Sequence, residues 1–508
     1  MIQGPPGTGK TSVISEIAYQ EIIKGNKVLI SSESNDAIEN ALERLNEDIF
    51  YPILYQSVSR QKNSASINLP IENDIGNFYK QKILKKIKYQ IDSILNIEDE
   101  INSIKIELTK LKEKVEKQIE SFKEIEDDDD LIQNYIKQKN KSINKFRKEY
   151  REKALKYENK IIFLDIQKEF CRELLDDRVC ESELKEIYSQ KANIIGATLN
   201  QIGKVAKKSN NSNLFDIVII DEVSKATPIE LNLAILKAKK IILVGDQKQL
   251  PPMLNREVTL EDFADKIFRN SEEYESKQEV KKELHEHKTV FEKLIENNPH
   301  AYTQLTTQYR MHKNIQKAIN QFYDEDLTCG LDNETRKNRH KLFNSNNLIW
   351  IDTSSSKENK IATSFQNIEE VTRIEKILKK LDEEYIQLDT IPTIGVISFY
   401  GKQVNRLSNI KNDFKNIKVD FGTVDTFQGQ ERDFIVVSMV RSNKNCDIGF
   451  ARSLNRINVA FSRAKQLLII VGSNSTFSQI KKSDSDDIKK AKEIYKKIYD
   501  MSFKGTLS

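Results

Sequence analysis

Cysteine is scarce in this sequence, and the cysteines present are not arranged in pairs. The four residues, Cys171, Cys180, Cys329 and Cys446, are scattered, and no two of them form a C-x-x-C motif. Zinc modules and disulfide frameworks both need characteristic cysteine spacings, so neither is predicted. This usage fits a reducing environment, and we expect an intracellular, cytoplasmic protein.

The sequence also lacks a signal peptide and any apolar run long enough to cross a membrane. An excess of one charge is lacking too, because 81 Lys and Arg against 77 Asp and Glu leave a net charge of only +4. This balance neither indicates nor excludes a nucleic-acid partner, so any basic binding track has to be local. We expect a soluble protein with no membrane partner.

What is present is enough chain for several domains. The 508 residues allow about three domains. An apolar fraction of 38% supports a real hydrophobic core, and a charged fraction of 31% indicates long solvated helices.

A phosphate-binding motif stands at the very start of the sequence. The segment MIQGPPGTGKT contains the pattern G-x-x-x-x-G-K-T. Its glycines let backbone N–H groups surround phosphate oxygens, Lys10 reaches the β and γ phosphates, and the Thr11 hydroxyl binds Mg²⁺. Residues Ser12–Ile23 read as a helix whose N-terminus points at the same phosphates. We predict that ATP is held by Gly4, Pro5, Pro6, Gly7, Thr8, Gly9, Lys10, Thr11 and Ser12, with Mg²⁺ on Thr11 and Asp221.

Alternating strand and helix patterns predict an α/β fold in two parts. In the first part, the short apolar runs are continuous rather than alternating, which is typical of parallel strands covered on both faces. These runs are Lys27–Ser32, Ala192–Thr198, Phe215–Ile220 and Ile241–Val244. A helical pattern follows the first run through Leu45, residues 46–75 are irregular, and residues 254–300 read as mostly charged helix. The second part has strands predicted at Asn347–Asp352, Thr393–Phe399, Val419–Val424, Phe434–Met439 and Leu467–Val471.

Between these parts of the sequence lies a segment of different composition, from Phe78 to Gln190. Proline is absent there and Lys, Glu and Ile dominate. Apolar residues recur every seven positions, at Ile87, Ile94, Ile101, Leu108, Val115 and Phe122, with a second series at Ile136, Ile143, Tyr150, Tyr157 and Leu164. This spacing predicts two long helices folded into an antiparallel coiled-coil hairpin with its tip near Asp127–Asp130. Its charges read as a solvated face, and the alternative is a surface for nucleic acid or a protein partner.

Two carboxylates follow the predicted strand Phe215–Ile220. Adjacent acids at a strand end suit an NTPase, because Asp221 can hold Mg²⁺ through water while Glu222 polarises the attacking water. An ordinary acidic loop is the alternative, and the upstream phosphate-binding motif makes the catalytic interpretation the better one.

The ordered motifs resemble those of a superfamily 1 helicase of the group that contains the nonsense-mediated-decay and senataxin-like helicases. The matching segments are GPPGTGKT, the SN of SESN, DEVS, GDQKQLPP, QYRMH (308–312), VDTFQGQERD (424–433) and NVAFSRAK (458–465). The resemblance covers nearly the whole chain outside residues 76–190 and 254–288. It implies an α/β fold of two RecA-like P-loop domains with parallel sheets, at 1–75 with 191–300 and at 301–480. The hairpin is inserted at 76–190, and a C-terminal helix or tail occupies 481–508.

The resemblance also implies roles for single residues. Gln249 would sense the γ-phosphate, Tyr309 would stack on the adenine, and Arg310 and Arg463 would be arginine fingers from the second domain. Gly429 and Glu431 would lie near the phosphates and the ribose. A contact path for single-stranded nucleic acid is implied at Ser34, Asn35, Thr198, Ser398, Tyr400, Gln403 and Thr426. Tyr400 departs from the family pattern, because it follows Phe399 where a proline is usual.

Two departures from the family bear on activity. Only Met1-Ile2-Gln3 precedes the phosphate-binding motif, and we therefore expect an N-terminally truncated member of the group. The small β-barrel that many relatives carry has no visible sequence here, and the hairpin takes its place.

We predict an ATP-dependent helicase or translocase on single-stranded DNA or RNA, with 5′→3′ polarity implied by the resemblance alone. A coiled-coil ATPase of the chromosome-maintenance type is rejected, because its signature motif is missing. A non-catalytic remnant that acts as a binding module, with a protein partner at the hairpin, is the alternative.

Overall fold

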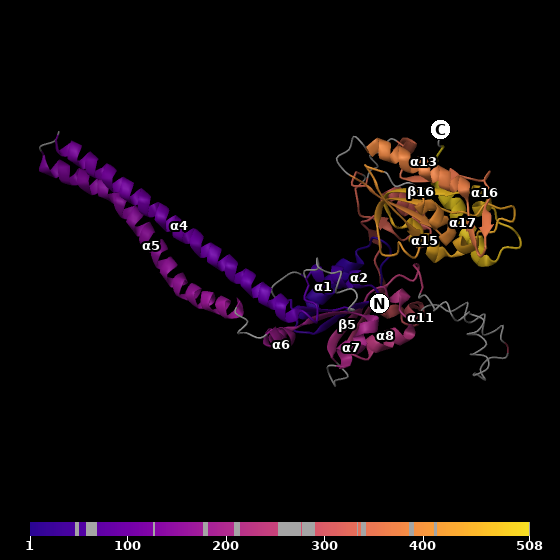
Figure 1. Ribbon diagram of the computed structural model, residues 1–508, viewed down its shortest axis with the longest axis horizontal. Helices are drawn as coiled ribbons and strands as arrows, with labels where there is room; N and C mark the ends of the chain where they lie inside the picture. The colour runs from indigo at the N-terminus through magenta and orange to yellow at the C-terminus, as the bar shows by residue number, and fades with distance from the viewer. Residues whose placement is uncertain are drawn as a thin grey trace. The chain divides into compact units, whose positions relative to one another are not determined.

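The structure is a computed structural model, shown in Figure 1. It describes residues 1–45, 50–56, 69–124, 128–175, 181–207, 214–251, 276, 290–332, 334–336, 342–385, 391–410 and 414–506. The chain divides into two compact units. Met1–Glu47 together with Ile194–Ser508 form the first unit, and Asp48–Asn193 form the second.

The first unit contains two parallel sheets, and the segments around each sheet are called here the first lobe (1–45 and 194–305) and the second lobe (306–506). In the first lobe the strands are β1 (Ile2–Gln3), β2 (Val28–Ser32), β4 (Ile194–Thr198), β5 (Phe215–Ile220), β6 (Ala238–Gly245) and β7 (Thr303–Gln304). Their order is β4-β2-β5-β6-β1-β7. Every neighbouring pair is parallel.

Helices cover this sheet on both sides. They are α1 (Lys10–Ile23), α2 (Asn35–Glu43), α7 (Ile202–Lys207), α8 (Pro228–Ile235) and α11 (Val290–Asn297), with 3₁₀ turns η1 (Leu199–Gln201), η2 (Val223–Lys225) and η3 (Pro299–Ala301). Figure 1 shows α1 and α2 on one side and α7 and α8 on the other. This double cover explains why the strands read as continuous apolar runs, with Ile217–Ile220 of β5 almost completely buried.

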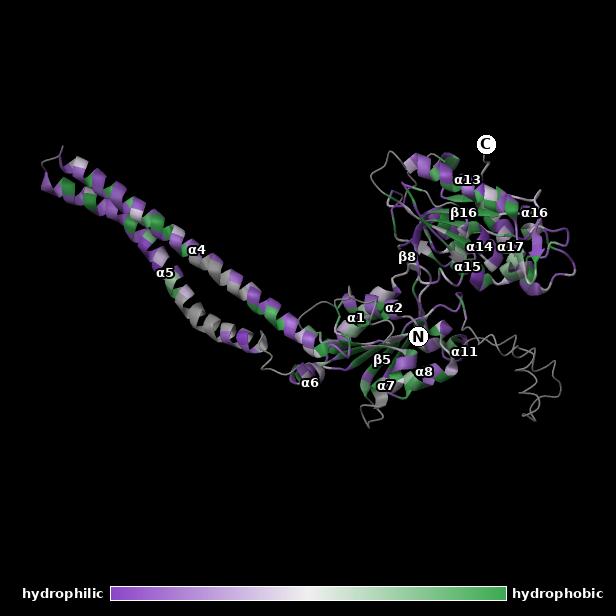
Figure 2. Cartoon of the chain, viewed as in Figure 1, coloured by the Kyte–Doolittle hydropathy of each residue, from purple (hydrophilic) through white to green (hydrophobic). Residues whose placement is uncertain are grey.

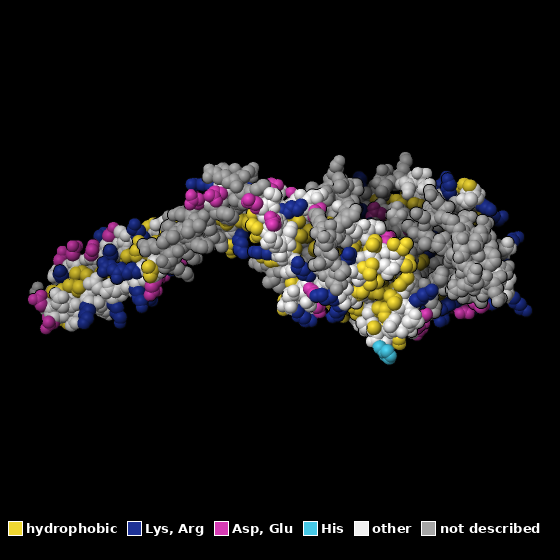
Figure 3. All heavy atoms as spheres, turned by 90° about the horizontal axis from the view of Figure 1, so that it is seen from below, with side chains coloured by type: hydrophobic (Ala, Val, Ile, Leu, Met, Phe, Trp, Pro, Cys, Tyr) yellow, Lys and Arg dark blue, Asp and Glu magenta, His cyan; other side chains and the backbone are white. Residues whose placement is uncertain are grey.

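The outer face of α8 is apolar and exposed. Ile229, Leu233 and Leu236 lie four and three residues apart, so they share one face of the helix. Figure 3 shows hydrophobic side chains gathered on this surface of the molecule.

In the second lobe the strands of the main sheet are β10 (Leu348–Asp352), β13 (Thr393–Ser398), β14 (Lys418–Thr423), β15 (Arg432–Ser438), β16 (Ala464–Gly472) and β17 (Phe503–Lys504). Their order is β14-β13-β15-β16-β10-β17, again parallel throughout. Short strands pair outside this sheet, namely β8 (Thr307–Gln308) with β9 (Thr328–Cys329), and β11 (Asn359–Ile361) with β12 (Ser364–Gln366).

Two hydrophobic cores lie on the two faces of this second sheet. The helices are α12 (Lys313–Asn320), α13 (Ile368–Tyr385), α14 (Gly401–Ser408), α15 (Leu454–Phe461), α16 (Asn474–Ser478) and α17 (Asp486–Met501), with turns η4 (Leu342–Ser345) and η5 (Gly449–Arg452). Strand β10 serves both cores because its side chains alternate between the faces. Trp350 packs with residues of α12, α15 and α17, whereas Ile349 and Ile351 pack with residues of α13 and α14.

Some sequence-based expectations differ from this fold. The strand predicted at Leu467–Val471 is longer, because β16 already begins at Ala464, shortly after α15 ends at Phe461. The tail after residue 480 is not only helix, since β17 joins the sheet beside β10. Residues 46–75, read as irregular, contain β3 (Pro52–Tyr55). Most of the charged segment 254–300 lies outside the described residues.

The strand that leads into the phosphate-binding motif is short but present. Ile2 and Gln3 form β1, which pairs with β6 on one side and β7 on the other.

The second unit is dominated by two long helices. It contains β3, α4 (Ile75–Lys123), α5 (Asp129–Leu175) and α6 (Glu181–Lys191). Helix α5 returns alongside α4 (Figure 1), and Lys153 Nζ of α5 lies 3.3 Å from Glu100 Oε2 of α4. Figure 2 shows that both helices are largely polar, with apolar residues interspersed.

Several heptad positions of these helices are buried, among them Ile87, Ile101, Val115 and Ile143. The regular packing of a coiled coil stays a prediction. Among the described residues, no helix combines the length and the apolar character needed to cross a membrane.

Candidate active site

The loop between β1 and α1 has the geometry of a phosphate cradle. Gly7 and Gly9 adopt φ values of +78° and +81°, which only glycine tolerates at low cost. Lys10 Nζ donates to the carbonyl oxygen of Gly4 at 2.6 Å. The lysine chain lies close over Gly4, because a Cβ there would come within 2.1 Å of Lys10 Cγ. A phosphate oxygen can replace this carbonyl as the acceptor.

The remaining predicted residues of this loop surround the same cradle. Thr8 Oγ1 donates to the Pro5 carbonyl at 2.8 Å, which fixes the turn. Thr11 and Ser12 lie in the first turn of α1, and Ser12 Oγ accepts a hydrogen bond from Arg44 at 2.7 Å.

The acidic pair lies at the carboxyl end of β5. Asp221 is buried, its N–H donates to Ser31 O at 2.8 Å, and its Oδ1 accepts from the Glu222 N–H at 2.8 Å. Glu222 adopts a left-handed φ of 53°, uncommon for a residue with a side chain. Such strain is often found at functional sites.

The surroundings shift the pKa values of Asp221 and Glu222 in opposite directions. Burial, reinforced by the charge of Glu222, raises the pKa of Asp221 to about 6. Burial also acts to raise the pKa of Glu222, but the positive charges of Lys10, Lys225, Arg463 and Arg310 outweigh it and hold this pKa below its usual value. Glu222 therefore stays ionised, as a group that must orient a water and accept a proton requires.

The end of the neighbouring strand β6 adds a third polar group. Gln249 is buried, and its Nε2 donates to Asp246 Oδ2 at 2.7 Å. Its Oε1 accepts from Arg463 of the second lobe at 3.4 Å. Gln249 thus links the first lobe to an arginine of the second.

Arg463 follows α15 and is almost completely buried. Its Nε donates to Val459 O at 3.0 Å, which directs the guanidinium toward Gln249. Burial, together with the charge of Arg310, lowers the pKa of Arg463 to about 10. A nearby anion stabilises such a buried arginine, because it offsets the free-energy cost of burying the positive charge.

Arg310 lies directly against the phosphate-binding loop. The Tyr309 N–H donates to Gly7 O at 2.8 Å, and a Cβ on Gly7 would come within 2.5 Å of Arg310 Cβ. The Arg310 guanidinium forms an ion pair with Glu431 and donates to Ser462 O at 3.2 Å. Burial acts to raise the pKa of Glu431, but Arg310 and Lys465 hold it below its usual value.

Several buried polar atoms around this site have no hydrogen-bond partner within the described part of the chain. Among them are Ser224 Oγ, Gln247 Oε1, Arg310 Nε and Asn458 Oδ1. Buried polar atoms are rarely left unpaired, so these are consistent with a polar ligand between the lobes. Tyr309 is 56% exposed, and Gly429 has a φ of +79° with open space around it.

The residues expected to contact nucleic acid in the first lobe come together at one sheet edge. Ser32, two residues before Ser34, is paired with Thr198 in the register of β2 and β4. The Ser34 N–H donates to Ser32 Oγ at 3.3 Å. Asn35 Oδ1 is buried and has no hydrogen-bond partner among the described residues.

The corresponding residues of the second lobe are placed differently. Ser398 Oγ donates to Ser438 O at 3.1 Å, and Gln403 Nε2 donates to Ser438 Oγ at 2.9 Å. Both side chains are fully buried, and Tyr400 is only 2% exposed. Thr426 is the exposed member of the set. The first three side chains are therefore occupied inside the fold, and their contact with a strand stays a prediction.

Sequence reasoning missed three buried groups near these residues. Tyr323 donates to Asp246 Oδ2 at 2.6 Å, across the two lobes. Glu370 is fully buried beneath Ser438, and Arg441 forms ion pairs with Glu358 and Asp447. The only available signal was position, since Arg441 lies three residues after the end of the buried strand β15.

Comparison with known proteins identifies the family. A family model described as an AAA domain matches residues 1–257, and another with the same description matches residues 286–475. The first covers more than half of the 508 residues.

Curated relatives agree with these matches. An uncharacterized ATP-dependent helicase of Methanocaldococcus jannaschii is 30% identical over 95% of this chain and 66% of its own length. The DNA polymerase alpha-associated DNA helicase A of Saccharomyces cerevisiae is 27% identical over 93% of this chain and 62% of its own length. The helicase sen1 of Schizosaccharomyces pombe is 28% identical over 94% of this chain and 28% of its own length.

The chain thus spans less than two thirds of the length of these relatives, down to 28% for sen1. The family assignment rests on the match of both lobes, in order, to the AAA domain. The chain belongs to the AAA domain family of superfamily 1 helicases, in the group that contains the nonsense-mediated-decay and senataxin-like helicases.

Proposed function

We propose that this chain is an ATP-dependent helicase or translocase that acts on single-stranded DNA or RNA. It hydrolyses ATP between two RecA-like domains at 1–75 with 191–300 and at 301–480, and it moves 5′→3′. One observation supports this most strongly. The positive charges of Lys10 in the first lobe and of Arg310 and Arg463 in the second all act to lower the pKa of Glu222.

The residues divide the chemistry between them. Backbone N–H groups of the loop and Lys10 hold the phosphates, with Lys10 leaving the Gly4 carbonyl to do so. Glu222 orients the attacking water and accepts its proton. Arg463 and Arg310 neutralise the charge on the transferred phosphoryl group, and Arg310 exchanges Glu431 for phosphate.

The donor set also fits a magnesium ion. Thr11 supplies a hydroxyl at the start of α1, and Asp221 supplies a buried carboxylate at the end of β5. Oxygen ligands of this kind, completed by phosphate and water, are those that Mg²⁺ prefers. When bound, the ion neutralises developing charge on the phosphates.

Hydrolysis is coupled to movement through the contacts between the lobes. Asn455 and Asn458 of α15 donate to the carbonyls of Gln247, Gln249 and Lys248, at 3.1, 2.5 and 2.8 Å. The same helix leads into Arg463. When ATP is hydrolysed, the contacts of Gln249 and Arg463 change, and the second lobe moves relative to the first.

The bound nucleic acid passes over the carboxyl ends of the β-strands in both lobes, where Ser34, Thr198 and Thr426 lie. Small hydroxyl groups and backbone amides at such an edge suit contacts with phosphates and sugars that are independent of sequence. The two long helices of the second unit pack as a coiled-coil hairpin. The polar surface of this hairpin binds a protein partner. The protein acts in the cytoplasm.

Unwinding of tailed duplexes tests this proposal. We expect ATP-dependent separation of a duplex with a 5′ single-stranded tail and little separation of the same duplex with a 3′ tail. Glu222→Gln is the control, and it should bind the tail but separate neither duplex. Preference for the 3′ tail would overturn the polarity. ATP hydrolysis without any movement on either strand would overturn the motor function.

A further inference from the structure

Phe450 presents an aromatic ring to solvent at the carboxyl edge of the second sheet. It lies in η5, between β15 and α15, and is 54% exposed. A single exposed apolar side chain needs no special explanation. Phe450 differs from such cases because its neighbours hold it in place.

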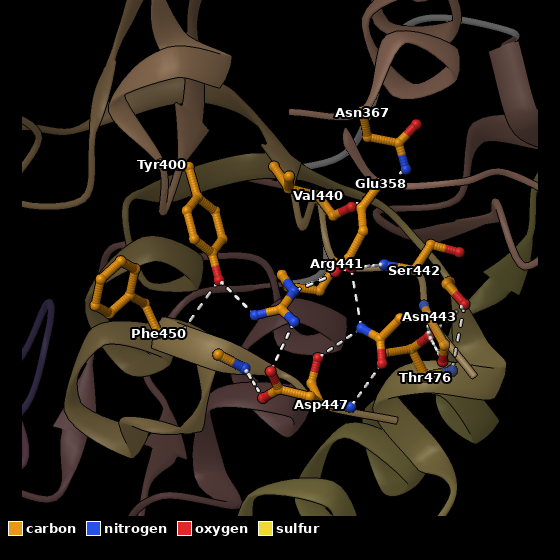
Figure 4. Close-up of polar contacts among 12 residues, drawn as sticks. Glu358, Asn367, Tyr400, Val440, Arg441, Ser442, Asn443, Asp447, Phe450 and Thr476 are labelled. Carbon is orange, nitrogen blue, oxygen red and sulfur yellow. Dashed lines mark hydrogen bonds and ion pairs between the residues drawn. The ribbon is translucent and has the colours of Figure 1, made fainter. Parts of the chain in front are cut away.

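Tyr400 supports this ring directly, as Figure 4 shows. The Phe450 N–H donates to the Tyr400 hydroxyl at 3.3 Å. The two ring centroids are 5.3 Å apart, with the planes inclined by 43°. Tyr400 itself is only 2% exposed, so it can hold Phe450 but cannot offer its own face to a ligand.

Arg441 fixes both Tyr400 and the loop that leads to Phe450. Its NH1 donates to the Tyr400 hydroxyl at 3.4 Å, and its NH2 donates to Asp447 Oδ2 at 2.7 Å. Its Nε donates to Glu358 Oε2 at 3.0 Å. The Gly449 N–H donates to Asp447 Oδ1 at 2.9 Å. Because Arg441 and Glu358 are both largely buried, their ion pair is little screened by solvent, whereas Asp447 is 59% exposed.

The surroundings of Phe450 contain the other groups that a nucleic-acid strand needs. The strand order β14-β13-β15 places the carboxyl ends of these three strands side by side. Thr426 exposes a hydroxyl just after β14, and its Oγ1 lies 3.0 Å from Thr423 Oγ1. Lys402 and Arg452 are exposed cations two residues from Tyr400 and from Phe450.

We propose that Phe450 is a stacking platform for one nucleobase of the bound strand, and that Tyr400 is the residue that positions it. Proteins that bind single strands without sequence preference combine cationic and hydroxyl contacts with aromatic faces, since every base has a face to stack. A ring held by a buried network loses little freedom on binding, which favours affinity. This inference rests on the proposed function, because it needs a strand at this edge.

Binding of a labelled single-stranded oligonucleotide to the full chain tests the stacking. We expect Phe450→Ala to raise Kd by about 5- to 150-fold, the range for loss of one stacked base. Phe450→Trp should keep Kd within about threefold, because it retains a π face. Ile391→Ala is the matched control: Ile391 is 64% exposed and precedes β13, at the opposite edge of the sheet, so Kd should not change.

An abasic scan distinguishes stacking from a general structural effect. Oligonucleotides that lack one base at successive positions keep every phosphate. We expect one position at which base removal weakens binding to the wild type but not to Phe450→Ala. Equal sensitivity of both proteins at every position would overturn the inference.

The positioning role of Tyr400 has its own readout. Tyr400→Phe removes the hydroxyl and should weaken binding by less than Phe450→Ala. The double variant should bind no more weakly than Phe450→Ala alone, since both changes act through one ring. Additive effects would overturn the role given to Tyr400.

The outcomes also separate this inference from the proposed function. If the wild-type chain binds no oligonucleotide, the proposed function fails together with the stacking. If the wild type binds and Phe450→Ala binds equally well, only the stacking platform is overturned.

Discussion

Arg310 and Arg463, the arginines of the proposed nucleotide site, already have polar partners that a negatively charged ligand can replace. Arg310 is paired with Glu431, and Arg463 with the amide oxygen of Gln249. We propose that phosphate oxygens replace both partners when ATP binds. Preorganised charge of this kind is the main source of catalysis in phosphoryl transfer.

We expect Tyr323 to couple the contact between Gln249 and the γ-phosphate to the second lobe. Its hydroxyl donates to Asp246 Oδ2 at 2.6 Å and accepts from Asn458 Nδ2 at 2.7 Å, while Asp246 also holds Gln249. Tyr323→Phe should lower the strand-stimulated kcat of ATP hydrolysis by about tenfold, the worth of one hydrogen bond to a charged group, with KM for ATP unchanged.

The matched control for Tyr323 is another buried tyrosine. Tyr495 donates to Ala451 O at 2.9 Å within the second lobe alone. Tyr495→Phe should lower the midpoint of thermal unfolding but leave kcat unchanged. If both variants lose kcat to the same extent, the link through Tyr323 is refuted.

Glu370 should make the second lobe less stable as pH rises. Burial raises the pKa of this carboxyl to about 8, although Ser438 Oγ and the Val440 N–H donate hydrogen bonds to it. Unfolding returns the pKa to its ordinary 4.5, so between these values the folded state binds more protons. Its contribution to the free energy of unfolding is therefore largest at low pH and is lost progressively up to about pH 8.

Glu370→Gln isolates this effect. The stability of the variant relative to wild type, measured by denaturant titration from pH 5 to pH 9, should increase with pH and level off above about pH 8. A difference that stays constant with pH would show that Glu370 does not titrate in this range.

At the scale of elements, α15 connects the proposed nucleic-acid edge of the second lobe with the proposed nucleotide site. It begins after Ser453, close to Phe450, and its residues Asn455 and Asn458 contact the first lobe. It ends two residues before Arg463. A rigid helix of this kind joins the proposed nucleic-acid edge to the nucleotide site.

The pairing of α4 with α5 gives a prediction for the second unit. Val115 is 4% exposed on α4, whereas Ile106 on the same helix is 56% exposed. Val115→Asp should lower the helical signal in circular dichroism and expose the hairpin to protease, because a charge would be buried without a partner. Ile106→Asp is the matched control and should change neither. Equal behaviour of both variants would contradict the pairing along this seam.

The sequence was most informative where one physical rule governs an element. Strand β5 has the predicted bounds, because a continuous apolar run covered on both faces has few alternatives. Short elements such as β17 and the β11–β12 hairpin have no such pattern, so they could not be predicted. The start of β16 was misplaced by three residues, at Leu467 instead of Ala464, because the apolar pattern runs on from α15 into β16.

The candidate site was predictable for a related reason. Phosphate chemistry restricts the residue types around Lys10 and Asp221, so a motif identifies them. The burial of Tyr400 was not predictable, because a tyrosine after a strand reads alike whether it faces solvent or the core. Its exposure of 2% and its contact with Arg441 in the folded chain show that it faces inward.

At the scale of the whole molecule, neither lobe alone contains all residues of the proposed ATP site. The first lobe contains the phosphate-binding loop with Asp221 and Glu222, and the second contains Arg310, Arg463 and the exposed ring of Phe450. We propose that the two lobes together hydrolyse ATP in response to a nucleic-acid strand.

The most direct measurement is the rate of ATP hydrolysis with and without single-stranded DNA or RNA, in the wild type and in Glu222→Gln. We predict strong stimulation by a strand in the wild type, and at least about a 100-fold loss of kcat in the variant with nucleotide binding retained. The better activator would identify the nucleic acid. Absence of hydrolysis under every condition, or a Glu222→Gln variant as active as wild type, would contradict ATP hydrolysis at this site and favour a binding module without catalysis.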